Sequence, residues 1–171
     1  MKKLTVVFVA IIILSVIFAV LASSTDGEIL NAVVNPQNGD IAIAYVDYSG
    51  RTGVQKIVLF NKDGEVLFST SILDIHHAGF AFDNDILYVE VGKLAKKLYR
   101  YNRNGEEISL DETSGNPVFL KDDFEDWKWS PFKRSYSLDG YEYVYTLPTA
   151  FRRAKLTIKN GERICELGEI L

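Results

Sequence analysis

Apolar positions divide the chain into one long continuous run near its beginning and a series of short alternating segments after it. The run from Leu4 to Leu21 contains no charged residue, and only Thr5 and Ser15 are polar. Beyond it, segments rich in Val, Ile, Tyr and Phe alternate with polar positions, are separated by turn residues and show no sustained helical period. Such alternation is typical of β-strands. The pattern predicts a membrane helix in residues 1–24, followed by an all-β domain in residues 25–171.

The N-terminal run is long enough to act as a membrane anchor. As a helix it would extend roughly 27 Å at about 1.5 Å per residue, close to the thickness of bilayer hydrocarbon. Lys2 and Lys3 favour the cytoplasmic side, so we expect a single-pass protein of the cell membrane whose β domain is extracytoplasmic. Cleavage near Ala22 and secretion is the alternative. The length of the run favours the anchor, because apolar regions of signal peptides usually span about 7–15 residues.

Three stretches of the β domain repeat one order of strands and turns. They span residues 29–70, 79–112 and 135–168, and residues 113–134 are inserted between the last two. In each repeat the third and fourth strands are joined by a tight polar turn that ends in glycine, at Gly64, Gly105 and Gly161. Glycine is expected there because such turns require a positive φ. The repeats predict three four-stranded antiparallel meanders.

These meanders resemble the blades of NHL-type and related six-bladed β-propellers. The resemblance is carried by the short apolar strand, the Asp/Asn-Gly turn and a third strand that ends in Phe-Asn-x-Asp-Gly-Glu, as at residues 60–65. It covers residues 29–112 more fully than 135–168. The Asn-x-Arg that commonly precedes the third strand of NHL blades is absent, because Gln55 and Lys56 stand in its place. The resemblance therefore implies blade-like sheets and no particular ligand or catalytic residue.

Three blades are too few to close a propeller, which usually needs at least four. The exposed sheet edges must therefore be covered in another way. Two chains could complete a six-bladed ring as a homodimer, or the three sheets could form an open arc, a partial propeller, with residues 113–134 as its cap. A twisted sandwich built from the same meanders is the alternative fold.

Composition excludes several classes of function. The 23 Asp and Glu residues exceed the 19 Lys and Arg residues, which gives a formal net charge of −4. Nucleic acid requires a basic surface, so no nucleic-acid partner is expected. Cys165 is the only cysteine, which excludes an intramolecular disulfide and a thiolate zinc cluster. The sequence also lacks a nucleophile elbow and a phosphate-binding glycine loop, so we predict no cofactor, no metal and no catalytic residue.

The longer loops should gather at the end of the meanders where each first strand begins, and binding residues are expected there. Long loops on a rigid scaffold usually carry the binding site. The candidate binding residues of these loops are Arg51, Asp74, His76, His77, Trp127, Trp129 and Arg152. We expect this end to face the membrane or a membrane-bound protein partner, while the N-terminal helix contacts lipid.

Two groups of candidates have an alternative interpretation. Trp127 and Trp129 suit the headgroup region of a membrane, but their rings could equally pack beneath a loop as part of the core. His76 and His77 lie next to Asp74 and could bind a metal or move protons. Neighbouring residues on an extended chain point to opposite sides, however, which favours ordinary loop histidines.

The sequence thus predicts a membrane-anchored extracytoplasmic binding or assembly module with no evident catalytic activity. The alternative is a secreted or envelope-associated propeller-like hydrolase or lyase, in which Asp74, His76, His77 and Arg51 or Arg152 converge at the long-loop end. A third hypothesis is that the anchor raises the local concentration of a weak homomeric contact. The positions of the side chains separate the first two, because catalytic groups must lie within reach of one another.

Overall fold

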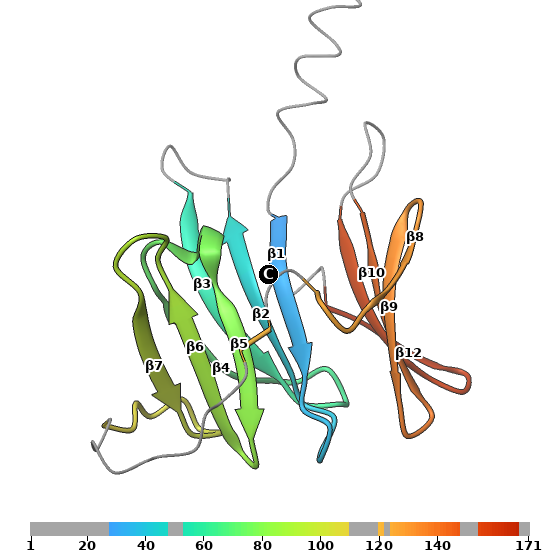
Figure 1. Cartoon of the computed structure of the whole chain (residues 1–171). Coiled ribbons are helices and arrows are strands. Elements are labelled where there is room, and N and C mark those ends of the chain that lie inside the picture. The colour runs from blue at the N-terminus through green and yellow to red at the C-terminus, as the bar shows by residue number, and fades with distance from the viewer. Residues whose placement is uncertain (1–27, 48–52, 110–119, 122–123, 148–153, 168–171) are drawn as a thin grey trace, which may run out of the picture.

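A computed structural model describes residues 28–47, 53–109, 120–121, 124–147 and 154–167. These residues form twelve β-strands and one short 3-10 helix, arranged in three antiparallel sheets (Figure 1). The prediction of an all-β fold is confirmed. The predicted N-terminal helix, residues 1–24, lies outside the described residues. Within the part of the chain that the structure describes, no helix is long and apolar enough to cross a membrane.

The first repeat forms a four-stranded sheet, which we call the central sheet. Its strands follow the sequence order: β1 (Glu28–Val34), β2 (Ile41–Asp47), β3 (Val54–Phe60) and β4 (Val66–Ser71). The predicted four-stranded meander is therefore present in this repeat.

The second repeat forms only a three-stranded sheet, which we call the second sheet. It consists of β5 (Gly79–Asp83), β6 (Ile86–Val91) and β7 (Lys97–Tyr101), and the 3-10 helix η1 (Ile75–His77) precedes it. The predicted fourth strand is reduced to a single bridge between Tyr101 and Glu107. The segment still bonds to β7, because the Ile108 N–H donates to the Arg100 carbonyl at 2.8 Å, and the predicted repeat from Leu110 onward lies outside the described residues.

The third repeat contributes to a five-stranded sheet, which we call the third sheet. Its strands are β8 (Lys128–Ser130), β9 (Lys133–Leu138), β10 (Tyr141–Thr146), β11 (Lys155–Asn160) and β12 (Arg163–Glu166). The predicted meander comprises β9 to β12. The additional strand β8 comes from the predicted insertion, residues 113–134, and pairs with β9 through a hairpin. Pro131 lies in the hairpin turn, where its missing N–H costs no strand pairing.

The central sheet lies between the second and the third sheets (Figure 1). Alternate side chains of β2 enter two different cores: Ile41, Ile43 and Tyr45 pack with the third sheet, and Ala42, Ala44 and Val46 pack with the second sheet. All six side chains are buried. Because both faces of this sheet are covered, β2 is continuously apolar and does not alternate.

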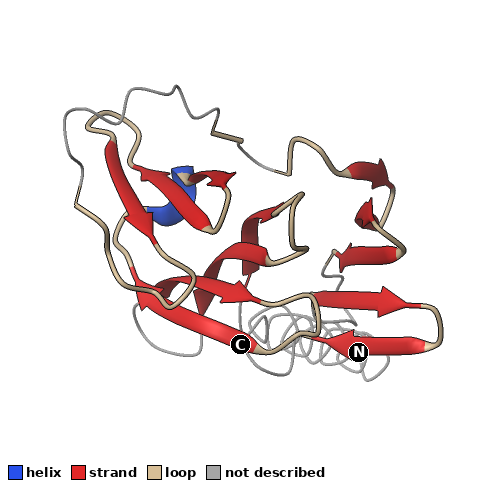
Figure 2. Ribbon diagram, turned by 90° about the horizontal axis from the view of Figure 1, so that it is seen from below, coloured by secondary structure: helices blue, strands red, loops and turns tan. Residues whose placement is uncertain are grey.

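Hydrogen bonds hold the segment that connects the second sheet to the third sheet against the edge strand β1. Lys121 exchanges two backbone hydrogen bonds with Phe80 of β5, at 3.0 and 2.7 Å. The Asn31 side chain, which is 3% exposed, donates to the carbonyls of Ala78 at 2.7 Å and Lys121 at 3.0 Å. Its oxygen accepts the Phe124 N–H at 3.0 Å. Asn31 therefore ties both neighbouring sheets to β1, and Figure 2 shows these three sheets from below.

Tight turns join the central sheet to the second sheet at the end opposite the beginning of β1. The buried Asp40 carboxylate accepts two hydrogen bonds from the Arg103 guanidinium, at 2.7 and 3.0 Å, which raises the pKa of Arg103. Nearby, the Asn35 side chain donates to the Asn84 carbonyl at 2.7 Å. These bonds link turns from different repeats, so they fix the two sheets relative to each other.

Two of the glycine turns make equivalent contacts with neighbouring sheets. A Cβ on Gly64 would lie 2.1 Å from the Cys165 Sγ of β12, and a Cβ on Gly105 would lie 2.7 Å from the Phe68 side chain of β4. Both glycines have positive φ, at 86° and 83°, as the turn prediction requires. Each turn therefore packs against the last strand of the next sheet: the second sheet on the central one, and the central sheet on the third.

Candidate functional site

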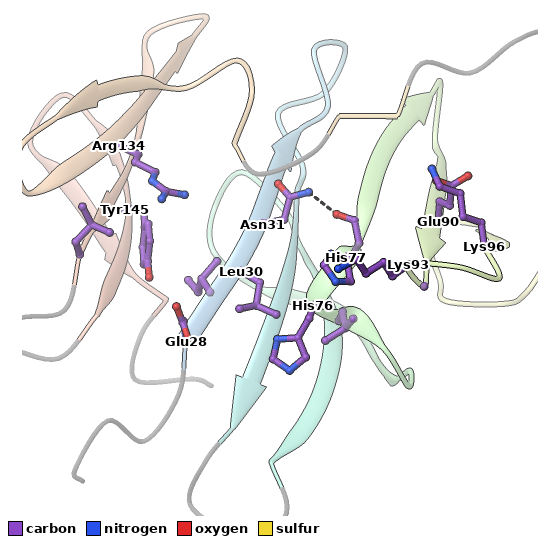
Figure 3. A pocket seen from close by; sticks show the side chains of 15 residues that line it. Glu28, Leu30, Asn31, His76, His77, Glu90, Lys93, Lys96, Arg134 and Tyr145 are labelled. Atoms are coloured by element: carbon purple, nitrogen blue, oxygen red, sulfur yellow. Dashed lines mark hydrogen bonds and ion pairs between the residues drawn. The ribbon is translucent and has the colours of Figure 1, made fainter. Parts of the chain in front are cut away.

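A cleft of about 720 Å³ opens at the end of the molecule where β1 begins. We call it the inter-sheet cleft, because residues from all three sheets line it (Figure 3). Its base is the first part of β1, residues 28–31. The second sheet and η1 supply one wall through Ile75, His76, His77, Ala78, Glu90, Gly92, Lys93 and Lys96. The third sheet supplies the other wall through Arg134, Tyr145 and Leu147.

A β-bulge shapes the base of the cleft. The register between β1 and β2 shifts between Ile29 and Asn31, so that Leu30 is the extra residue. Ile29 consequently enters the core shared with the third sheet, whereas Leu30 packs against the core shared with the second sheet. Bulges commonly redirect side chains at sheet edges in this way. Asn31, which follows the bulge, donates to the Ala78 carbonyl at 2.7 Å, next to the histidine wall.

The histidine wall is built on a helical turn. Asp74 adopts a left-handed conformation, with φ 66°, immediately before η1. Ile75 is fully buried, and its N–H donates to the Gln55 side chain at 2.8 Å. This bond holds the turn against β3 of the central sheet. His76 and His77 are exposed and both line the cleft. The prediction that the two histidine side chains point to opposite sides assumed an extended backbone. The backbone here is a 3-10 helix, and both side chains line the same cleft.

The β6–β7 loop extends this wall with charged side chains. Glu90 and Lys96 form an ion pair across the loop, and Lys93 is exposed between them in sequence. Gly92 has φ 98°, which a side chain would strain. A Cβ on Gly92 would also lie 2.6 Å from the Ala95 carbonyl, so the loop is closely folded on itself.

The opposite wall carries an arginine stacked on aromatic rings. The Arg134 guanidinium lies 3.8 Å from the centroid of Trp129 and 4.4 Å from that of Phe124. Phe124 in turn stacks on Tyr145, with centroids 5.2 Å apart and planes inclined by 9°. Burial raises the pKa of Tyr145 to about 12, and the charge of Glu28 adds to this effect. The hydroxyl of Tyr145 thus lies in a cleft wall near the Glu28 carboxylate and the Arg134 guanidinium.

The cleft is suited to binding a polar ligand. Basic side chains stand on both walls, with the Glu28 carboxylate at the base and the Glu90 carboxylate beside Lys96 on the second-sheet wall (Figure 3). The described residues that line the cleft include no Ser, Thr or Cys. Across the described ranges, no group of three or more His, Cys, Asp or Glu side chains could hold a metal ion. The arrangement supplies hydrogen bonds and charge on two facing walls.

The structure brings together some of the residues predicted from sequence and separates others. His76 and His77 line the cleft, and the exposed Trp129 stacks on Arg134 at its rim. Trp127 is 4% exposed and lies edge-on to Phe124 in the core, so for this residue the packing interpretation holds. Asp74 is not among the lining residues. Arg51 and Arg152 lie outside the described residues.

Sequence reasoning missed most of the polar residues of the cleft. These are Glu28, Asn31, Glu90, Lys93, Lys96, Arg134 and Tyr145. One signal was available, because Asn31 interrupts an otherwise apolar strand, and a buried amide must find hydrogen-bond partners. The two lysines lie in an ordinary polar loop, and the remaining residues lie in strands whose sequence gives no sign of a shared site. Only the packing of three sheets brings them together.

Comparisons of the chain with protein-family models, with curated proteins and with solved structures found no match. The resemblance of the repeats to NHL-type blades therefore stays a prediction. The function must be inferred from the geometry of this chain and from its sequence pattern.

Proposed function

We propose that this protein is a membrane-anchored, extracytoplasmic binding module whose inter-sheet cleft receives a polar segment of a partner protein. One observation carries the proposal: the cleft opens where β1 begins, and Glu28 itself lines it. The apolar run ends at Leu21, so the residues between this run and Glu28 can extend roughly 20 Å at most. An anchor in that run would hold the cleft close to the bilayer.

The chemistry of the cleft supports a peptide segment as the ligand. Sites for small organic molecules are mostly enclosed and lined by apolar and aromatic side chains. This cleft combines apolar residues such as Leu30, Ile75 and Leu147 with lysine, histidine, arginine and glutamate side chains, and its charged groups stand on two facing walls. A peptide with charged groups can form ion pairs with both walls at once, and its backbone can bond to the edge strand β1.

No specific observation favours the hydrolase or lyase alternative. That alternative required Asp74 and the two histidines to converge with Arg51 or Arg152. Asp74 does not line the cleft, and both arginines lie outside the described residues. We therefore retain binding as the proposed activity.

We further propose that the three sheets are the blades of an open arc, a partial propeller in which the third repeat precedes the first. The turns of Gly105 and Gly64 support this, because they make the same contact with the next sheet in two successive pairs of sheets. Propeller blades stack in such a head-to-tail manner. The outward face of the third sheet carries the ion pairs Lys159–Glu142 and Lys155–Glu166. A polar outer face is typical of a capping repeat and disfavours a six-bladed homodimer.

Site-specific photocrosslinking of the full chain in its native membranes tests the binding function. A photoreactive amino acid at Lys93 in the cleft wall should give adducts of discrete mass with a protein. The same amino acid at Lys62, an exposed lysine in a tight turn at the opposite end, is the matched control and should not. Negative charge introduced at His76 and Lys96, as His76→Glu and Lys96→Glu, should reduce the Lys93 adduct at least about tenfold. Equal adducts from both positions, or none from Lys93, would contradict the proposal.

A further inference from the structure

We infer that the β domain touches the lipid bilayer directly, through three loop tips that surround the inter-sheet cleft. This inference rests on the proposed membrane anchoring and adds a second, independent contact with lipid. It is carried by the distribution of exposed apolar side chains over the described surface.

The three most exposed large hydrophobic side chains lie at the cleft end, each in a different loop. Leu94 in the β6–β7 loop is 97% exposed, Leu73 in the loop before η1 is 87% exposed, and Phe132 in the β8–β9 turn is 67% exposed. Trp129, in the same hairpin as Phe132, is also exposed. The strands β4, β6 and β8 all run toward this end before their loops begin (Figure 1). Three loops that project apolar tips in one direction suit insertion into a bilayer surface.

Basic residues accompany two of these three apolar tips, whereas Leu73 is followed by the acidic Asp74. Lys93 is next to Leu94, and Lys128 and Lys133 flank the hairpin that carries Trp129 and Phe132. All three lysines are exposed. Aromatic rings with neighbouring cations are characteristic of the headgroup region, and lysines near an anionic surface strengthen its attraction for the protein. The occupant of this surface is therefore a bilayer that contains anionic lipid.

The part of the chain outside the structure indicates the same occupant. Residues 1–27 precede the described domain, and the described chain begins at Glu28, which lines the cleft that the loop tips surround. The apolar run to Leu21 lies within this part. If it spans the bilayer, the short connection to Glu28 directs this end of the β domain, and no other, toward the lipid.

Tryptophan fluorescence gives a clean test, because Trp127 and Trp129 are the only tryptophans of the chain. The full chain is reconstituted into vesicles of phosphatidylcholine and phosphatidylglycerol whose acyl chains carry bromine close to the headgroup. The exposed Trp129 should be quenched, and total emission should fall at least about 1.3-fold relative to unbrominated vesicles. Trp129→Phe should abolish this difference, because Trp127 is shielded within the core.

Matched variants separate insertion of the loop tips from mere proximity. The triple variant Leu73→Ser, Leu94→Ser, Phe132→Ser should lose the quenching while its unfolding midpoint stays unchanged. The control variant Val66→Ser, Ile164→Ser removes exposed apolar side chains at the opposite end and should keep it. Absence of quenching in the natural chain, or quenching that persists in the triple variant, would overturn the inference. If the natural chain shows no quenching but still gives the Lys93 crosslinks, the lipid contact is wrong and the proposed binding function is supported. If quenching is seen but the Lys93 crosslinks are absent, the binding function is wrong and the lipid contact is supported.

Discussion

The two ends of the β domain are built from the same strands but differ in what joins the sheets. At the turn end, the buried Asp40 binds Arg103, and the Tyr143 hydroxyl donates to the Gly39 carbonyl at 2.6 Å. At the cleft end, exposed loops carry charged and apolar side chains around a cavity. Interlocking turns at one end hold the three sheets in place, which leaves the loops at the other end available for binding.

The residues that stabilise the fold and the residues proposed to bind a partner therefore lie at opposite ends of the strands. Groups at the turn end are buried and paired, so changing one of them should cost folding free energy. Groups at the cleft end are largely exposed, so changing one should alter binding and leave folding almost unaffected. The predictions below test this separation, in order of decreasing effect on stability.

The largest effect is expected at Gly64. Alanine there would bring a Cβ within 2.1 Å of the Cys165 Sγ and would also strain a backbone with φ 86°. We expect Gly64→Ala to lower the free energy of unfolding by about 3 kcal/mol, of which about 1 kcal/mol is backbone strain. Urea unfolding of the protein in detergent, followed by tryptophan fluorescence, would measure this.

Gly161 is the matched control for this substitution. It occupies the equivalent turn of the third sheet with φ 57°, but nothing lies within 4 Å of its potential Cβ. Gly161→Ala should therefore cost only about 1 kcal/mol, the backbone term alone. Equal losses for the two variants would show that the contact between the central and third sheets does not restrain the turn. The added change Cys165→Ala should recover part of the Gly64→Ala loss.

A smaller effect is expected when the ion pair between the central and second sheets is broken. The Asp40 side chain is 2% exposed and accepts two bonds from Arg103. Asp40→Ala should lower the free energy of unfolding by about 2 kcal/mol, as is usual for buried hydrogen bonds with charged groups. Arg163→Ala removes the exposed pair with Asp63 and should cost at most about 0.5 kcal/mol. Similar losses in thermal or urea unfolding would argue against a locked turn end.

Alkaline pH should weaken both ends through two buried tyrosines of β10. Burial raises the pKa of Tyr145 to about 12 and raises that of Tyr143 further. The folded state therefore holds these protons at a pH where the unfolded chain, with a pKa near 10, has released them. This contribution to stability is complete below about pH 10 and is lost as the pH rises toward 12 and above.

Phenylalanine variants assign the alkaline loss to each end. Tyr145→Phe, at the cleft, should reduce the slope of stability between about pH 10 and 12 by about 1.4 kcal/mol per pH unit. Tyr143→Phe should reduce it similarly but should also lower stability at neutral pH, because the bond to the Gly39 carbonyl is lost. An alkaline profile of Tyr145→Phe identical to that of the natural chain would contradict the assignment. Urea titrations at a series of pH values provide the measurement.

The strands could be predicted from sequence because their information is local. Strands β7 (Lys97–Tyr101) and β10 (Tyr141–Thr146) lie within the predicted repeats 79–112 and 135–168, and the glycine turns adopt the expected positive φ. The added strand β8, and the single bridge that the described residues form in place of a fourth strand in the second sheet, could not be predicted in the same way. Both lie at sheet edges, where the tertiary environment decides whether a weak segment pairs.

From the sequence, only the end of the domain that carries the cleft could be predicted, and most of the residues that line the cleft could not. The long-loop end and its histidines followed from the order of strands and turns, but Arg134 and Glu90 lie in strands that give no sign of a shared site. The positions of such residues depend on which sheets are neighbours. The pattern of apolar residues in a sequence predicts that one face of a strand is buried, but it does not predict which sheet packs against that face.

By itself, the sequence determined an apolar N-terminal run, an all-β domain with repeated meanders, and the end at which long loops collect. Alternation and turn chemistry are properties of neighbouring residues, so they can be read without the fold. The tertiary structure alone decided that the first repeat lies in the middle and that three sheets converge on one cleft. The continuous apolar run of β2 is consistent with that position, but only the packing of both its faces identifies the partners.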